Sequence, residues 1–369
     1  MNLTDSDKQE RLKVVLLYGG NSPEHDVSRS SALHVVKSID LKRYETHLVA
    51  IDKSGIWYEF KRDLSMQDQS SLDRPLPIEG HQINPVEYLS AFNSMEIIVF
   101  PVLHGPNGED GTIQGFLELF DITYVGSGVL SSALCMDKIK CKELLYAHNV
   151  PQTKWISIHK SSIADLKEHS INLDGDLFVK PANMGSSIGI SKVTDRKNIK
   201  KALSKAAEYD EWIIVEEAIN GREIEVAILE DGELAASVPG EIIPGADFYD
   251  YEDKYEDGAT LQIPAPLTDD EVLKVQDLAI TVFKLLNCRD LARVDFFYKE
   301  SEKEWLVNEV NTMPGFTPIS MYPKLWSATG IPYEVLVNHL LSEPHQKSCL
   351  LYTSPSPRDL STSRMPSSA

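Results

Sequence analysis

Short apolar runs alternate with segments of helical periodicity in the first part of the chain. The run KVVLLY at residues 13–18 ends in Gly19 and Gly20, a pattern typical of a buried strand that leads into a glycine turn. The expected elements are strands at residues 13–18, 44–52 and 96–102 and helices at residues 27–39 and 112–120. Because strands that alternate with helices build parallel sheets, this region predicts an α/β domain.

A second type of pattern begins after Pro151. A helix at residues 131–148 is expected to end before this proline, which discourages its continuation. Beyond it, the expected elements are strands at residues 154–158, 176–180, 188–193 and 212–216 and a Lys-rich helix at residues 195–209. The pattern predicts a small α+β module.

The third region also begins with strands. Two strand candidates flank an Asp231-Gly232 hairpin turn, and residues 245–260 form an acidic, Tyr-rich stretch without apolar periodicity. We interpret this stretch as a long loop over a site. The remaining expected elements are helices at residues 269–286 and 333–341 and strands at residues 291–298 and 305–310.

The chain changes character after Glu343. Residues 348–369 are rich in Ser and Pro with almost no apolar periodicity, so they predict disorder. This stretch also resembles translated adapter sequence, and we hypothesise that residues 346–369 are a non-native tail.

Composition restricts the class of partner. The 369 residues carry a net charge of −20, which argues against a surface that binds nucleic acid or an anionic membrane. An anionic ligand would have to be held by local cations or a metal. Four cysteines without CxxC spacing indicate neither a zinc site nor a disulfide framework, and no segment approaches the length of a membrane span. We therefore expect a cytoplasmic protein.

Two apolar strands each present a polar pair. In ARVDFFY, Arg293 and Asp295 share a face, and in WLVNEVN, Glu309 and Asn311 do so. Buried carboxylates must be paired or bind a metal, and three oxygen ligands of this kind suit Mg²⁺. The alternative is a buried Arg293–Glu309 ion pair without a metal.

The segment FVKPANMGSSIGI predicts a strand, a loop and a second strand. Two glycines leave backbone N–H groups accessible to phosphate oxygens, Ser186 and Ser187 add hydroxyl donors, and Lys180 supplies a cation. A plain hairpin turn is the alternative. Residues 126–128, a Gly-Ser-Gly turn, give a weaker phosphate signal.

Two more segments follow strand ends, where α/β folds usually build sites. GGNSPEHDVS contains Glu24, and FPVLHGPNGEDG contains His104. The alternatives are that the first segment only caps a helix through Ser22 or Asn21, and that the second only connects two elements. Their common position favours a shared crevice.

Taken together, these segments resemble the D-alanine–D-alanine ligase family. The similarity extends from about Val14 to Leu341. Its pieces occur in the family's order: GGNSPEHDVS, HGPNGEDGTIQG, MDKIKCK, FVKPANMGSSIGISKV, the EE…GRE stretch at residues 216–223, FYDYEDKY, ARVDFFY and NEVNTMPGFTPIS. The resemblance implies an ATP-grasp fold with a nucleotide between the central and C-terminal domains. The implied domains are residues 1–133 for substrate, 134–220 as the central ATP-grasp part and 221–345 as the catalytic part.

The resemblance also implies the reaction. ATP phosphorylates the carboxylate of one D-alanine, and the amine of a second D-alanine attacks the D-alanyl phosphate, which gives the dipeptide for peptidoglycan precursors. By this resemblance Asp295, Glu309 and Asn311 match the ligands of two Mg²⁺ ions, which Mn²⁺ could replace. The residues matching the ATP site are Lys138, Lys180, Ser187, Glu216, Glu217, Ala218, Ile219, Glu223 and Lys254.

The implied substrate site lies at the ends of several segments. Glu24 would receive the ammonium group of the first D-alanine, near His104, and Ser186 and Tyr255 would join Glu24 in closing the site. Arg293 and the Gly315 backbone match the groups that stabilise the oxyanion, and Ser320, followed by Met321, matches the contact to the second carboxylate.

Three further expectations follow from the family. The nearest alternatives are ligases of the same fold that join D-alanine to D-lactate or D-serine, and the pair Lys254-Tyr255 favours D-alanine. An alternative from another class is a non-catalytic nucleotide-binding protein with the same fold. The presence of all the matching site residues argues against it, because binding alone would not require them. The family also implies a homodimer.

Overall fold

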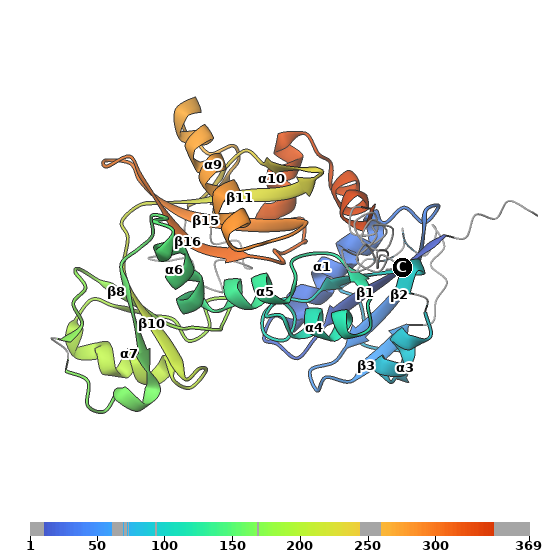
Figure 1. Cartoon of the computed structure of the whole chain (residues 1–369), viewed down its shortest axis with the longest axis horizontal. Helices are drawn as coiled ribbons and strands as arrows, with labels where there is room; N and C mark the ends of the chain where they lie inside the picture. Colours follow the sequence, from blue (N-terminus) through green and yellow to red (C-terminus); the bar gives the residue numbers. More distant parts are fainter. Residues whose placement is uncertain are drawn as a thin grey trace, which may run out of the picture.

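The computed structural model describes residues 11–60, 69, 72, 74–92, 94–167, 170–243 and 260–342. Three parts follow one another along the chain, each built on its own sheet (Figure 1). The predicted tail and residues 245–259 of the predicted loop lie outside the described residues. The polar N-terminal stretch before Arg11 does so as well.

The first part is a six-stranded sheet in the order β4-β3-β2-β1-β5-β6. The neighbours β2-β1, β1-β5 and β5-β6 are parallel, which confirms the prediction, whereas β2-β3 and β3-β4 are antiparallel. Its strands are β1 (Leu12–Gly19), β2 (Tyr44–Ile51), β3 (Trp57–Phe60), β4 (His81–Ile83), β5 (Ile97–Val102) and β6 (Thr123–Tyr124). Its helices are α1 (His25–Ser38), α3 (Pro85–Ser90), η1 (Ser94–Glu96) and α4 (Thr112–Leu119).

The apolar run in β1 is continuous because both of its faces are buried. Val14 and Leu16 belong to one hydrophobic core, which also contains residues of α1. Val15 and Leu17 point to the other face and belong to a second core. Side chains that alternate between two cores require an apolar residue at every position of the strand.

The helix expected at residues 131–148 is two helices. The prediction was wrong because α5 (Val129–Met136) and α6 (Lys138–Ala147) are separated by Asp137, whose backbone is extended. The Asp137 carboxylate accepts hydrogen bonds from the backbone N–H groups of Ile139 and Lys140, at 3.0 Å each. This N-cap begins a new helix, and its first residue is Lys138.

The central part is a four-stranded antiparallel sheet in the order β7-β10-β8-β9, with α7 packed against it. Its strands are β7 (Trp155–His159), β8 (Leu177–Pro181), β9 (Ser191–Val193) and β10 (Trp212–Glu217). Its helices are η2 (Lys160–Ser162), η4 (Arg196–Asn198) and α7 (Ile199–Ala206). The predicted α+β module is confirmed.

The third part is a sheet of antiparallel strand pairs in the order β14-β13-β11-β15-β16, with β12 paired to β11. Its strands are β11 (Arg222–Asp231), β12 (Glu233–Ala236), β13 (Gly240–Ile243), β14 (Thr260–Gln262), β15 (Leu291–Lys299) and β16 (Glu304–Asn311). Its helices are α9 (Asp269–Leu285), α10 (Met321–Thr329) and a last helix at residues 333–342. The hairpin at Asp231-Gly232 is confirmed, and α10 was not predicted.

The hydrophobic cores do not follow the three parts. One core joins α1 and the first sheet to α10 and the last helix, so the first and third parts share it. The central sheet packs against α7 in a core of its own. In the part of the chain that the structure describes, none of the helices combines the length and the apolar character of a membrane span.

Candidate active site

Two cavities meet where the three parts come together. The larger has a volume of about 620 Å³ and lies between the central and third parts, and the smaller, of about 140 Å³, is lined also by the first part. The residues that line both are Lys138, Met184, Gly185, Ser186, Glu225, Arg293 and Glu309. A group bound in one cavity therefore lies next to a group bound in the other.

The larger cavity gathers the residues predicted to bind ATP. They come from α6, β8, the loop after β8, β10, the segment between β10 and β11, and β11. These residues are Lys138, Lys180, Ser187, Glu216, Glu217, Ala218, Ile219 and Glu223. Lys254 lies outside the described residues. A concave site with lysines and backbone groups suits a phosphorylated ligand.

Two lysines share one buried carboxylate beside this cavity. Lys180 Nζ lies 2.7 Å from Glu216 Oε2, and Lys142 Nζ lies 2.8 Å from Glu216 Oε1. Burial opposes ionisation of Glu216, but the two ammonium groups together hold its pKa well below the usual range. Sequence reasoning missed Lys142, although it lies one helical turn after Lys138 on the same face of α6.

The loop after β8 is folded tightly around the boundary between the cavities. Ser186 and Ser187 have φ values of +49° and +59°, and the Met184 carbonyl accepts a hydrogen bond of 2.6 Å from Lys138 Nζ. The predicted strand, loop and strand are confirmed, because β8 pairs with β9. The loop between them lines both cavities, and its binding of phosphate stays a prediction.

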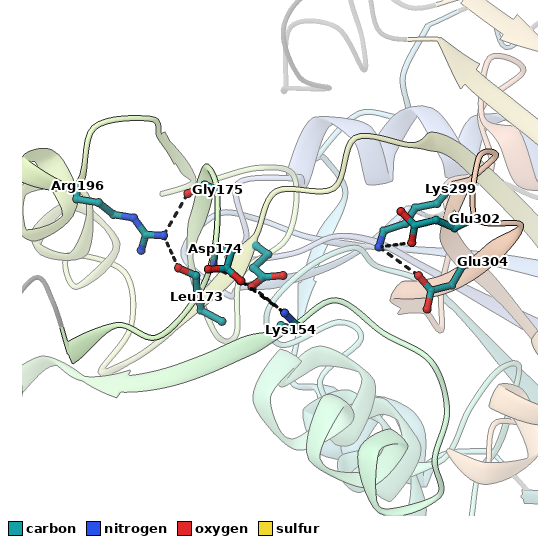
Figure 2. Close-up of polar contacts among 9 residues, drawn as sticks. Lys154, Leu173, Asp174, Gly175, Arg196, Lys299, Glu302 and Glu304 are labelled. Atoms are coloured by element: carbon teal, nitrogen blue, oxygen red, sulfur yellow. Dashed lines mark hydrogen bonds and ion pairs between the residues drawn. The ribbon is translucent and has the colours of Figure 1, made fainter.

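Glu217 connects the cavity wall to the surface of the central part. Lys154 lies 3.5 Å from Glu217 Oε1 and 3.8 Å from Asp174 Oδ2, and Figure 2 shows Lys154 and Asp174 facing each other. Glu217 Oε1 also accepts a hydrogen bond of 2.8 Å from the Asp174 backbone N–H. These contacts fix the end of β10.

Arg293 holds two carboxylates between the cavities. Its Nε and Nη2 atoms each donate to Asp295 at 2.7 Å, and Nε lies 2.9 Å from Glu225 Oε2. Burial opposes the charge, but Asp295 and Glu225 raise the pKa of Arg293 further. Glu225 was not predicted, although alternation along β11 places it on the face of Glu223, and it pairs in register with Asp295.

The three predicted metal ligands lie on neighbouring strands. Asp295 pairs in register with Glu309, and Asn311 pairs with Arg293. Asn311 Nδ2 donates to Asp295 Oδ2 at 3.0 Å, which leaves its amide oxygen as the acceptor atom. No cluster of three or more His, Cys, Asp or Glu side chains suited to a metal occurs in the part of the chain that the structure describes. Two carboxylates and an amide are nevertheless the hard oxygen donors that Mg²⁺ prefers.

The smaller cavity gathers the residues predicted to bind substrate. Its lining includes Glu24, His104, Ser186, Arg293, Gly315, Ser320 and Met321. Tyr255, the remaining predicted member, lies outside the described residues. Residues from all three parts of the chain therefore meet at one cavity.

Glu24 is fixed at the start of α1. The Ser186 hydroxyl donates to Glu24 Oε1, and the Ser22 hydroxyl accepts a 3.0 Å hydrogen bond from the Glu24 backbone N–H. A Cβ atom at Gly105 would lie 2.8 Å from Glu24 Oε2, and one at Gly185 would lie 3.0 Å from it. These two glycines let the backbone approach the carboxylate closely.

His104 contacts the loop that carries Gly315. Its Nδ1 donates to the Met313 carbonyl at 3.1 Å, so Nε2 is the acceptor for the Ser31 hydroxyl at 3.0 Å. The same Ser31 oxygen accepts a hydrogen bond of 3.2 Å from the Phe316 N–H. Burial lowers the pKa of His104, although the nearby Glu24 carboxylate acts in the opposite direction. The lowered pKa favours the neutral form of the imidazole.

Gly315 lies against Ser320 at the start of α10. A Cβ atom at position 315 would come within 2.7 Å of Ser320 Oγ, so only glycine fits without displacement. Ser320 Oγ accepts a hydrogen bond of 3.1 Å from the Thr317 N–H. The turn thus fixes the Ser320 hydroxyl at the wall of the smaller cavity.

Glu109 is a further carboxyl group in the smaller cavity that was not singled out from the sequence. Its Oε1 atom accepts a 2.9 Å hydrogen bond from the Gly105 N–H. Burial, reinforced by the charge of Glu24, raises the pKa of Glu109 to about 8. Only the folded chain reveals this, because the cause is the proximity of two carboxyl groups distant in sequence.

The chain is similar to known ligases over most of its length. Residues 13–127 match the family described as D-ala D-ala ligase N-terminus, and residues 144–342 match D-ala D-ala ligase C-terminus. A D-alanine–D-alanine ligase from Thermoanaerobacter pseudethanolicus is 42% identical over 92% of this chain and 99% of its own length. One from Geobacillus kaustophilus is 43% identical over 93% of this chain and 98% of its own.

Solved structures of similar proteins have the same fold. The D-alanine–D-alanine ligase from Coxiella burnetii aligns with a TM-score of 0.75 and 32% identity, covering 93% of this chain and 96% of that one. The D-Ala:D-Ser ligase from Enterococcus faecalis aligns with a TM-score of 0.77 and 34% identity, covering 90% and 99%.

Proposed function

The chain belongs to the D-alanine–D-alanine ligase family, and on that premise we propose how its two joined cavities carry out the ATP-dependent ligation of two D-alanine molecules. The observation that carries the assignment of roles is the shared wall of the cavities, which contains Arg293 and Glu309. A phosphoryl donor in the larger cavity and a carboxylate in the smaller one would meet at this wall. Proximity of this kind is a large part of catalysis in phosphoryl transfer.

The larger cavity is the proposed ATP site. Lys138 and Lys180 supply positive charge for the phosphates, and Ser187 and the backbone of the same loop supply hydrogen-bond donors. The segment at Glu216, Glu217, Ala218 and Ile219 is the proposed adenine contact, and Glu223 the ribose contact. Local cations thus hold an anion on a protein whose net charge is −20.

Asp295, Glu309 and Asn311 are the proposed Mg²⁺ ligands, and the resemblance implies two ions. Their oxygen donors fit this cation, and Mn²⁺ accepts the same donors. When bound, the metal would offset negative charge on the phosphates. Asn311 and Arg293 both bond to Asp295, so they hold its carboxylate in a fixed orientation.

The smaller cavity is the proposed site for both D-alanine molecules. Glu24 would receive the ammonium group of the first, and His104 keeps the Gly315 loop in place through Met313. Ser320 and the adjoining Met321 would contact the second molecule at its carboxylate. Lys254 and Tyr255, which lie outside the described residues, are proposed to complete closure over the site and exclude water from the acyl phosphate.

Arg293 is the proposed stabiliser of the tetrahedral intermediate, together with the Gly315 backbone. The guanidinium is only 16% exposed and stays charged at all working pH values. A fixed cation aimed at the developing oxyanion lowers the barrier for attack by the second amine. When the amide bond forms, the C–O bond of the acyl phosphate breaks, phosphate leaves, and the nitrogen of the attacking amine loses a proton.

We also propose a homodimer in the cytoplasm. Leu119 at the end of α4 is 84% exposed and Leu130 at the start of α5 is 62% exposed, and these two helices pack together. Apolar side chains of this size on neighbouring helices suit an interface between copies. Light scattering of the purified protein tests the dimer, and a monomer at micromolar concentration would refute it.

A competition experiment tests the function and its substrate. The protein is incubated with ATP, Mg²⁺ and equal amounts of D-alanine, D-serine and D-lactate, and the products are identified by mass spectrometry. We expect D-alanyl-D-alanine as the main product, with one phosphate released per dipeptide. If a product of D-alanine with D-serine or D-lactate dominates, the proposed second substrate is wrong. If the folded protein releases no phosphate that depends on D-alanine, the assigned function is refuted.

A further inference from the structure

A buried lysine contacts a residue of the proposed ATP site but does not line the cavity itself. Lys142 on α6 is 3% exposed and is absent from the lining of either cavity. Its ammonium group lies 2.8 Å from Glu216 Oε1 and donates to Thr153 Oγ1 at 2.9 Å. A fully buried lysine is rare and requires charged partners.

The partner carboxylate is shared between two cations. Glu216 holds Lys142 with one oxygen and Lys180 with the other, and Thr153 donates to the oxygen on the Lys142 side at 3.1 Å. Two ammonium groups and one carboxylate leave a net charge of +1 on three side chains that are largely buried, with exposed fractions of 4% for Lys142 and Glu216 and 14% for Lys180. Lys180 lines the nucleotide cavity, so this charge is presented to its ligand.

We propose that Lys142 is a positioning residue that keeps Lys180 available to nucleotide phosphates by taking up half of the Glu216 carboxylate. Without Lys142, the charge of Glu216 would be neutralised by Lys180 alone. The pair would then be neutral and would hold Lys180 on the carboxylate rather than on a phosphate. This inference rests on the proposed ATP site and adds a residue to it.

The position of Lys142 on α6 supports this role. Lys138 begins α6 and lines both cavities, and Lys142 lies one turn later on the same face. One helix therefore supplies the site with a cation that faces the ligand and a second that acts through Glu216. Charge in this buried setting is poorly screened and acts over several ångströms.

The test compares a ligand with phosphates and one without. Affinities of the full-length protein for ADP with Mg²⁺ and for adenosine are measured by calorimetry. For Lys142→Met we expect the preference for ADP over adenosine to fall roughly tenfold, because only the phosphates sense the lost charge. If Lys142 had a purely structural role, its loss would lower the affinities for ADP and adenosine by the same factor. An equal loss of both affinities, or no change in either, would overturn the proposal.

A matched control lies on the same helix. Lys140 forms a 2.8 Å ion pair with Glu143, and its side chain is 57% exposed. Lys140→Met removes the same charge from α6, but solvent screens it, so the ligand preference should stay unchanged. A drop as large as that of Lys142→Met would show that net charge alone is responsible and would overturn the proposal.

Two more variants keep the proposal testable if Lys142→Met does not fold. Lys142→Arg retains the cation and should retain the preference for ADP. Glu216→Gln removes the carboxylate from both lysines and should shift the preference the other way, toward ADP. A loss of preference in either variant would contradict the proposal. If the wild-type protein itself fails to bind ADP, the proposed ATP site is wrong; if it binds and the variants do not differ, only this inference fails.

Discussion

The hydroxyl of Ser186 donates a hydrogen bond to the carboxylate of Glu24, and so joins the loop after β8 to the turn after β1 across 162 positions of the chain. This contact closes the central part of the molecule against the first part at the smaller cavity. Both residues line that cavity.

Ser186→Ala removes this contact. We expect the KM for D-alanine to rise about tenfold, because a hydrogen bond to a charged group is lost, while the KM for ATP changes little. Steady-state kinetics with each substrate varied in turn measure both constants. Ser187→Ala is the control: Ser187 lines only the larger cavity, so its loss should act on ATP. If Ser186→Ala raised the KM for ATP and left the KM for D-alanine unchanged, Ser186 would not belong to the substrate site.

Glu309→Gln should lower turnover about 100-fold without unfolding the protein, because it replaces the charged carboxylate of a proposed metal ligand by a neutral amide of the same shape. The affinity for Mn²⁺, measured by electron paramagnetic resonance, should fall in parallel. Glu304→Gln is the control on the same strand, because Glu304 forms a 3.1 Å ion pair with Lys299 (Figure 2). Neither of these two residues lines either cavity. Normal Mn²⁺ binding by Glu309→Gln would refute the metal role.

Arg293→Lys keeps a positive charge but loses the fork that binds both oxygens of Asp295. We expect dipeptide formation to fall by about 100-fold or more, because the cation no longer lies where the oxyanion develops. ADP binding should remain within about threefold of the wild type. Product quantification and calorimetry give the two readings. A variant that forms dipeptide at the normal rate would exclude Arg293 from the chemistry.

Glu271 predicts an acid-sensitive part of the stability. Hydrogen bonds from Tyr298 and then from Thr268 lower the pKa of Glu271 to about 2 from 4.5 in the unfolded chain. Its contribution is therefore present above pH 4.5 and is lost as the pH falls toward 2. Because solvent screens this group, we expect Glu271→Gln to lower the free energy of unfolding by only about 1 kcal/mol at pH 7.

Urea denaturation at pH 7 and pH 3 checks the sign. The difference in the free energy of unfolding between the wild type and Glu271→Gln should be smaller at pH 3 than at pH 7. Asp270→Asn serves as control, because Asp270 forms only an exposed i,i+4 pair with Lys274 on the same helix. A gap that widens on acidification would show that the carboxylate is not stabilised in the folded state.

Local patterns predicted the parallel strands of the first part and the hairpin at Asp231-Gly232 in the third. β1 was evident because its residues are buried on both faces, whereas β3 and β4 were missed because few of their side chains are buried. The break between α5 and α6 depends on one side chain, Asp137, acting as a cap within an otherwise helical pattern. Such a local competition is invisible to apolar periodicity.

Motifs and the alternation of side chains along strands predicted only part of the candidate site. Asp295, Glu309 and Asn311 followed from alternation, and they do lie on adjacent strands. Lys142, Glu225 and Glu109 were missed because their importance arises from contacts between distant segments. Lys142 resembles any other lysine of a helix until the fold buries it against Glu216.

The core shared by the first and third parts has a consequence for synthesis on the ribosome. Asn338 in the last helix donates to the Ser38 carbonyl at 2.7 Å and accepts from the Asp40 N–H at 2.9 Å, and Leu340 and Leu341 pack in the same core as α1. The first sheet leaves the ribosome first, yet the core between one of its faces and α1 is not complete until these residues are made. The central sheet, with its own core, can fold meanwhile. The earliest part of the chain to be translated is thus among the last to be completed.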